Sequence, residues 1–378
     1  MMTLVVPLWA LDIGASAFVI GTAIAMRAIL AMFFSIQAGA VMDRLGTRRI
    51  TILAGVASCF LVLLYPMFPF VEVLLILQVI VGFMHLIGWI GAQALVGRMT
   101  KGEPHLMGYF TFLATFGNFL GPFLAGLAFH HLGKWGAFGL VSVWSFAFVL
   151  VTLTVPKSLD SGAQSMISTR ELLPKWANYL SGFQLMKTPI IGYIIVISAI
   201  LSGTYAMRHA FFGVYMEGIY FSRDEIGFVI GCIALASSFS SLCVGWLARW
   251  IASHWLVLMG TILATITFGC APLFETFTAL LIVACATGVF SGIAFPMILS
   301  ILTKAAITRN QGLSVGLRAT MNRIASFTVP IIMGTIVAAY GVEVGFFAMT
   351  SLILSIAAVM AVILVLILRH GNQKKEHL

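Results

Sequence analysis

Charged residues are scarce in this sequence. Only 9% of its 378 residues are Asp, Glu, Lys or Arg, whereas 61% are hydrophobic. A water-soluble domain carries about 25% charged residues, so this chain has too few charges to cover a surface that faces water. Lipid must therefore surround most of that surface, and the composition predicts a protein embedded in a membrane.

Regular alternation of polar and apolar residues is also missing. Strands of a membrane barrel would alternate over about 10 positions, but the apolar runs here continue over about 20 residues. Because lipid offers no partners for backbone amides, such runs must be helices, and the sequence predicts an all-α membrane protein. We expect eleven full spans, at 15–40, 50–70, 72–97, 107–130, 135–155, 188–216, 225–250, 255–273, 277–303, 312–340 and 345–368. The apolar stretch 4–11 precedes them and is too short to cross a membrane alone.

Groups that would support enzymatic or metal chemistry are few. The five cysteines lie inside apolar runs without the spacing of metal ligands. The sequence has no Gly-x-x-x-x-Gly-Lys-Ser/Thr loop for a nucleotide and no Ser–His–Asp or His/Asp set at a usable spacing. We therefore expect no enzyme, no metal site, no cofactor and no ATP-driven pump. The net charge of +9 comes from particular loops, which indicates membrane topology rather than nucleic-acid binding.

Acidic residues are missing from the middle of the predicted spans. All twelve lie at loops or span ends, the nearest being Asp12 and Glu217, whereas four arginines lie inside spans. A charge in hydrocarbon costs about 2.5–3.5 kcal/mol on insertion scales, so these side chains need a cavity or a partner. Two explanations stay open. Either an arginine-lined cavity receives an anionic substrate, or the arginines snorkel, bond carbonyls or pair with an acid outside this chain. The four are Arg27, Arg208, Arg318 and Arg323.

Other polar and aromatic side chains accompany these arginines. Gln78, His85 and Trp89 form one stripe along a predicted helix, at i, i+7 and i+11. His85 and His209 are candidates for carrying protons, although a histidine in a membrane helix is more often a packing group. The predicted substrate and ion pathway therefore comprises Arg27, Gln78, His85, Trp89, Tyr205, Arg208, His209, Arg318, Asn322 and Arg323.

The basic residues are unevenly shared between the two membrane faces. When loops are assigned to alternate sides, fifteen of the 21 Lys and Arg residues fall on one side, and only Lys134 and Arg223 fall on the other. The positive-inside rule places the first side in the cytoplasm, together with the central loop and the C-terminus. We expect a multi-pass protein of the inner or plasma membrane, and a monomer.

The two halves of the chain resemble each other. Gly21 and Gly39 recur 206 positions later as Gly227 and Gly245. A second set recurs after 208 positions: Pro122, Gly126, Gly133 and Phe138 match Pro330, Gly334, Gly341 and Phe346. Parallel repeats of this size occur in transporters, where substrate binds between the halves near mid-membrane. We expect an N-terminal bundle at 1–155, a cytoplasmic linker at 156–187 and a C-terminal bundle at 188–378. The first helix of the first half is mostly absent, which indicates a shortened product, a misassigned start or a fragment.

The loop after the first full span reads GAVMDRLGTRR. It resembles the signature loop between helices two and three of the major facilitator superfamily, which has Gly, three residues, Asp, a basic residue, one residue, Gly, and then further basic residues. The matching positions are Gly39, Asp43, Arg44, Gly46, Arg48 and Arg49. The resemblance implies a two-bundle fold with eleven of twelve helices present here. It also implies a conformational latch, in which the Asp43 carboxylate pairs with a basic group or a helix N-terminus.

A second segment, GYFTFLATFGNFLGPFLAG, resembles the antiporter motif of the same superfamily, which that family associates with export. Its matching positions are Gly108, Gly117, Gly121, Pro122 and Gly126, while Ala125 replaces one glycine of the pattern. Glycines at these intervals leave a flat helix face for a neighbour, and Pro122 removes a backbone donor and bends the helix.

Two positions depart from the family pattern. Gln78 stands where proton-coupled members have Arg, and Arg249 stands where a second copy of the loop would have Asp. Taken together, the sequence predicts a secondary transporter of the drug:proton antiporter branch, which exports small amphipathic or anionic organic molecules in exchange for protons by alternating access. The alternatives are proton-coupled uptake of an organic anion and a truncated protein that does not transport.

Overall fold

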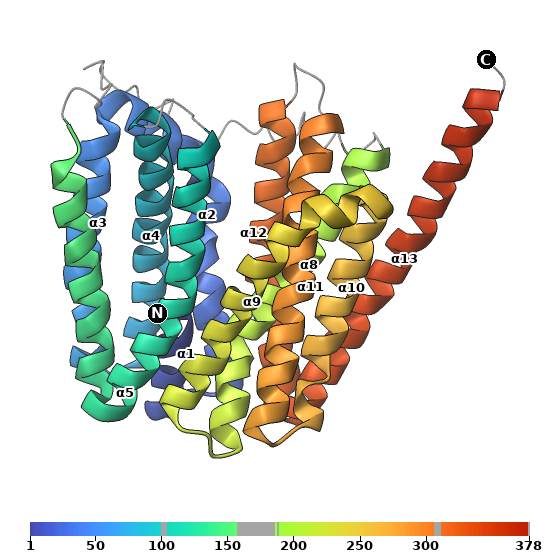
Figure 1. Cartoon of the computed structure of the whole chain (residues 1–378). Helices are drawn as coiled ribbons and strands as arrows, with labels where there is room; N and C mark the ends of the chain where they lie inside the picture. The colour runs from blue at the N-terminus through green and yellow to red at the C-terminus, as the bar shows by residue number, and fades with distance from the viewer. Residues whose placement is uncertain (100–103, 157–185, 187–188, 306–310, 377–378) are drawn as a thin grey trace. The chain divides into compact units, whose positions relative to one another are not determined.

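The computed structural model describes residues 1–99, 104–156, 186, 189–305 and 311–376, and within these ranges the chain is helical without any strand (Figure 1). The helices of the first half are α1 (Met2–Asp12), α2 (Ala17–Leu45), α3 (Thr47–Met67), α4 (Val71–Met99) and α5 (Pro104–Thr154). Those of the second half are α8 (Pro189–Gly218), α9 (Arg223–Trp250), α10 (Ser253–Gly269), α11 (Phe277–Ala305), α12 (Gln311–Tyr340) and α13 (Val342–Glu376), with a 3-10 turn at Ala271–Leu273. The predicted all-α membrane fold is confirmed.

The predicted spans all fall on these helices. Ten helices of the described chain are long and apolar enough to cross a membrane. One of them, α5, contains a non-helical residue, Gly133, with φ 64° and ψ −161°. This break separates two arms that coincide with the predicted spans 107–130 and 135–155, which gives the eleven expected crossings. The short apolar stretch at 4–11 is the helix α1.

The described residues form two compact units. The first contains α1 to α5 together with His209–Gly231, the end of α8 and the beginning of α9. The second contains the remainder of α8 and α9 together with α10 to α13. The predicted linker, 156–187, lies almost entirely outside the described residues, so the predicted bundle boundaries at 155 and 188 stay a prediction.

Small residues bring the helices of the first unit together. In this unit α3 packs against α4 and α5, and α2 packs against α4. A Cβ atom on Gly55 of α3 would lie 2.7 Å from Val149 Cγ2 of α5, which is closer than real Cβ contacts. Helices in lipid associate through such close contacts, because no hydrophobic effect drives them together there.

The second unit is built in the same way. Here α10 packs against α11 and α13, and α12 packs against α13. A Cβ atom on Gly260 of α10 would lie 2.9 Å from the Phe290 carbonyl oxygen of α11. The Phe268 and Phe346 rings, from α10 and α13, lie 5.3 Å apart between centroids.

Two glycines of the sequence repeat share a positive φ angle. Gly133 and Gly341 have φ values of 64° and 89°, a region that is costly for residues with a Cβ atom. Each glycine is followed five residues later by a fully buried phenylalanine, Phe138 or Phe346. Both halves therefore use glycine to end one span and phenylalanine to anchor the next.

Candidate functional site

A partly buried polar contact joins α2 and α4. Arg27 Nη2 lies 3.2 Å from His85 Nδ1. A guanidinium only donates hydrogen bonds, so Nδ1 must accept, and the neutral His85 ring then carries its proton on Nε2. A protonated imidazole has no free acceptor nitrogen. Protonation of His85 is therefore incompatible with this hydrogen bond.

Gly82 permits the close approach of the two helices at this contact. A Cβ atom at Gly82 would lie 2.8 Å from both Cα and Cγ of Arg27. The sequence analysis did not identify Gly82 as a site residue. Its position one helical turn before His85, on the same face of α4, could have indicated that Gly82 belongs to the site.

The other two members of the α4 stripe have different surroundings. Gln78 is 1% exposed, whereas Trp89 is 48% exposed and stacks on Phe110, with the ring centroids 6.0 Å apart. The stripe therefore runs from a buried end at Gln78, past the Arg27 contact at His85, to an open aromatic end at Trp89.

Arg208, on α8, is a second arginine inside a membrane span. Its Cζ atom lies 4.8 Å from the centroid of the Tyr205 ring, in a cation–π contact. Its Nε and Nη1 atoms are buried and have no hydrogen-bond partner in the described part of the chain. Removing a guanidinium from water without giving it a hydrogen-bond acceptor costs free energy. These N–H groups are therefore donors that can bind an acceptor on a ligand.

A third polar cluster joins α8 and α12 in the second unit. The Ser198 hydroxyl donates to Asn322 Oδ1 at 3.0 Å, and Arg318 Nη1 donates to Ser198 Oγ at 3.5 Å. Ser198 was missed by the sequence analysis, since a single serine in an apolar run gives no signal. Arg323 is half-buried on the same helix, and His209, which follows Arg208, belongs to the first unit.

The signature loop turns at Gly46, which ends α2 and precedes α3 with φ 98°. Arg48 Nη2 donates to the Leu153 carbonyl oxygen at 2.8 Å, so this basic residue caps the C-terminal end of α5. Arg49 is exposed. The backbones of Gly39, Asp43 and Arg44 lie in α2, but the side chains of Asp43 and Arg44 lie outside the described part of the structure, so the Asp43 latch stays a prediction.

The antiporter-motif segment forms the first part of α5, and it contacts α9. A Cβ atom on Gly227 would lie 2.5 Å from the Pro122 carbonyl oxygen and 3.1 Å from Gly126 Cα. Gly121 packs against Met1, whereas Gly117 has open space around it. Gly108 lies in the helix, but its surroundings are not described. Pro122 and Gly126 therefore form a close seam with α9.

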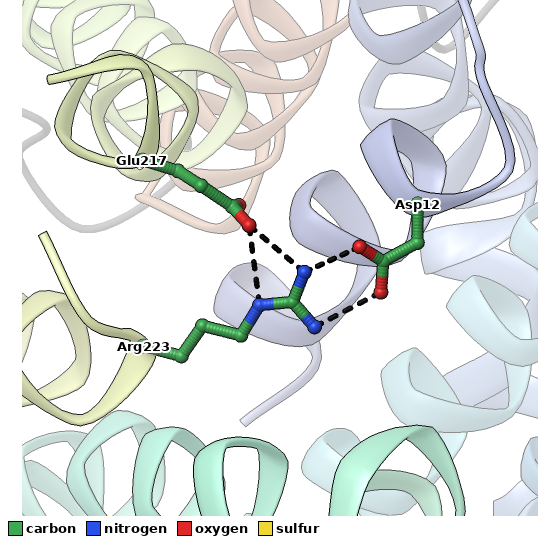
Figure 2. A network of polar contacts seen from close by, with 3 residues as sticks. All are labelled: Asp12, Glu217 and Arg223. Atoms are coloured by element: carbon green, nitrogen blue, oxygen red, sulfur yellow. Dashed lines mark hydrogen bonds and ion pairs between the residues drawn. The ribbon is translucent and has the colours of Figure 1, made fainter. Parts of the chain in front are cut away.

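A network of three charged residues was not predicted as a site (Figure 2). Arg223 of α9 donates to both Asp12 carboxylate oxygens, from Nη1 to Oδ2 at 2.9 Å and from Nη2 to Oδ1. It also donates to Glu217 Oε1, from Nη2 at 2.8 Å and from Nε at 3.2 Å. One sequence feature could have indicated this site: Arg223 and Lys134 are the only basic residues expected on their membrane face. Lys134 also contacts α1, with its Nζ 5.1 Å from the centroid of the Trp9 ring.

Comparison with known protein families gave one match. The sequence profile described as Major Facilitator Superfamily matches residues 1–220 and 194–377. A comparison with curated protein sequences gave no match.

Solved structures share the fold at low sequence identity. A point mutant of the nucleoside transporter NupG is 14% identical, with a TM-score of 0.79, over 96% of this chain and 94% of that chain. A bacterial homologue of the human lysosomal transporter Spinster was solved in two inward-facing conformations. Its occupied form is 13% identical, with a TM-score of 0.73, over 96% of this chain and 92% of that chain. Its unoccupied form is 14% identical, with a TM-score of 0.75, over 95% and 91%.

Proposed function

Because the chain belongs to the Major Facilitator Superfamily, we propose that it is a secondary transporter that exports small amphipathic organic anions in exchange for protons. The inference that the substrate is an anion rests on Arg208, whose buried Nε and Nη1 atoms have no acceptor among the described residues. A substrate carboxylate or phosphate supplies that acceptor and neutralises the charge. The adjacent Tyr205 ring supplies an apolar surface for the rest of the molecule.

Arg27 and His85 support the exchange of a proton. In the conformation seen here, the Arg27 guanidinium occupies the acceptor nitrogen of a neutral His85. A proton that binds at Nδ1 breaks this contact and places two cations side by side, which drives the α2 and α4 side chains apart. His85 is thus a chemically suitable proton carrier, and Arg27 is the group that responds to its protonation.

The export direction rests on the antiporter-motif segment of α5 and on the predicted orientation. Pro122 and Gly126 form a backbone contact with Gly227 of α9, which is the kind of rigid helix seam that the motif implies. The fifteen basic residues on one face favour a cytoplasmic location for the central loop and the C-terminus.

Transport in vesicles tests this proposal. The purified protein is reconstituted, and uptake of a panel of radiolabelled aryl carboxylates and their neutral amides is measured under imposed pH gradients. We expect carboxylates to accumulate in everted vesicles with an acidic interior, and the amides to accumulate far less. Accumulation in right-side-out vesicles that is driven by an inward proton gradient would contradict export and indicate uptake.

Two variants link the result to Arg208. Arg208→Gln removes the charge and should abolish accumulation of the carboxylates, whereas Arg208→Lys should retain part of it. Arg249→Gln makes the same charge change at an exposed position in the last turn of α9 and serves as the matched control. Equal losses in Arg208→Gln and Arg249→Gln would remove the support for Arg208 as the anion site.

A further inference from the structure

The polar cluster between α8 and α12 contains a cation whose charge is not neutralised. Arg318 Nη1 donates to Ser198 Oγ at 3.5 Å, whereas the buried Nε atom of Arg318 has no hydrogen-bond partner in the described part of the chain. Ser198 in turn donates to Asn322 Oδ1 at 3.0 Å. Because a hydroxyl is a neutral acceptor, Ser198 satisfies one N–H group of Arg318 and leaves its positive charge uncompensated.

Acidic residues of the second unit lie away from this cluster. Within the described ranges of that unit they are Glu275, before α11, and Glu343 and Glu376, near the two ends of α13. No ion pair joins Arg318 to an acidic residue of the described chain. A partly buried guanidinium without a carboxylate is costly, and an anionic ligand with oxygen acceptors removes that cost.

One face of α12 presents the cluster to α8. The positions i, i+4, i+7 and i+11 on this face are Arg318, Asn322, Ala325 and Val329. Two separate contacts show that the face meets α8. Arg318 and Asn322 bond to Ser198, and a Cβ atom on Gly203 of α8 would lie 3.1 Å from Val329 Cγ2. The two helices therefore run side by side from the polar cluster onwards.

The helix α8 leads from this cluster to Arg208. Ser198, Tyr205 and Arg208 stand at i, i+7 and i+10 along α8, and all three belong to the second unit. Ten residues of helix span about 15 Å. The predicted topology places the beginning of α12, and with it Arg318, on the cytoplasmic side of the membrane. An anion that arrives from the cytoplasm therefore reaches Arg318 before it reaches Arg208.

We propose, on the basis of the proposed export of organic anions, that Arg318 and Asn322 form a second anion-binding site, which receives the substrate before Arg208 does. Arg318 donates from Nε to a carboxylate or phosphate oxygen, and the Asn322 amide donates a further hydrogen bond, since its Oδ1 atom is occupied by Ser198. Arg208 has two unpartnered nitrogen atoms and Arg318 has one. The receiving site therefore binds the anion more weakly than Arg208 and passes it on.

Protection of a cysteine from alkylation tests this site in the purified protein. The five native cysteines are replaced first, and Ala325→Cys introduces a reporter thiol at a half-buried position on the α12 face that carries Arg318. N-ethylmaleimide then alkylates the reporter in the presence of benzoate or of its neutral counterpart benzamide. We expect benzoate to slow alkylation and benzamide to have little effect.

Charge changes at three arginines separate this site from the one at Arg208. Arg318→Gln should raise the benzoate concentration for half-protection about tenfold or more, because a hydrogen bond to a charged group is lost, and Arg318→Lys should fall between. Arg208→Gln should leave that concentration within about twofold, since about 15 Å of helix separates the two sites. Arg249→Gln, at an exposed position of α9, is the matched control and should leave it unchanged.

The outcomes distinguish the receiving site from the proposed function. Equal protection by benzoate and benzamide, no protection by benzoate, or unchanged protection in both Arg318 variants would overturn the receiving site. So would protection that is lost in Arg208→Gln and kept in Arg318→Gln, although that result would leave Arg208 as the transport site. Protection that requires Arg318, without carboxylate accumulation in the vesicles, would instead support the receiving site and contradict export.

Discussion

The backbones of Gly126 and Gly227 touch, since a Cβ atom on Gly126 would lie 3.1 Å from the Cα atom of Gly227. This contact joins the antiporter-motif segment of α5 to α9. It shows why the motif needs glycine at this position. Any side chain at Gly126 would also collide with the Arg223 carbonyl oxygen at the start of α9.

Gly126→Ala should therefore destabilise the protein, because the added methyl group forces the two helices apart. Overpacking of this kind costs about 1–3 kcal/mol. We expect a lower thermal unfolding midpoint in detergent. Gly117→Ala is the matched control on the same helix, since nothing lies within 4 Å of its Cβ position. Equal midpoints for the two variants would contradict the seam.

The positive φ values of Gly133 and Gly341 lead to a second prediction. Replacing either glycine by alanine places a Cβ atom on a backbone with a positive φ, which costs about 1–3 kcal/mol. We expect similar decreases in thermal stability for the two variants, because both glycines end a span in the same way. Gly139→Ala, in the helical arm after Gly133 and with open space around it, should change stability little. A loss in only one of the two halves would argue against structural equivalence of the repeats.

His85→Gln separates the hydrogen bond from proton exchange. Glutamine offers an amide oxygen that accepts from Arg27, but it does not titrate. We expect the variant to fold and to bind substrate, and to move at least about tenfold fewer protons per substrate. A pH-sensitive dye inside proteoliposomes measures this ratio. A native ratio in His85→Gln would exclude His85 as the carrier.

The signature loop leads to a prediction about Asp43. Asp43→Asn keeps the size of the side chain and removes its charge, so we expect a transport rate reduced by about tenfold or more with little change in the amount of folded protein. Size-exclusion chromatography and the initial transport rate measure the two quantities separately. Normal transport by Asp43→Asn would remove the latch role.

The helices and the polar contacts differed in how far the sequence predicted them. Long apolar runs located the spans, and the break in α5 was expected because 130–135 interrupts the apolar pattern near Gly133. The sequence also identified Arg27 and Arg208 as candidate site residues, since charged residues rarely occur inside apolar runs. The sequence could not predict that Arg27 meets His85, because 58 residues separate them and only the packing of α2 on α4 brings them together.

The Arg223 network shows the same limit more sharply. Its partner Asp12 lies 211 residues away in the chain, and each residue alone resembles an ordinary charge at a helix end. Arg48 likewise matched a motif, but its acceptor, the Leu153 carbonyl, belongs to the backbone and has no sequence signature. Pairings of this kind depend on tertiary packing, which periodicity and composition do not encode.

Equilibrium binding to Arg208 variants tests the central claim most directly. A carboxylate substrate and its neutral amide are titrated into the native protein, Arg208→Lys and Arg208→Gln in detergent. A hydrogen bond to a charged group contributes about 1.5–3 kcal/mol, so Arg208→Gln should weaken carboxylate binding by about 10- to 150-fold while changing amide binding little, with Arg208→Lys between. Equal weakening of both ligands, or no weakening of either, would contradict the assignment of Arg208 as the group that binds the substrate's negative charge.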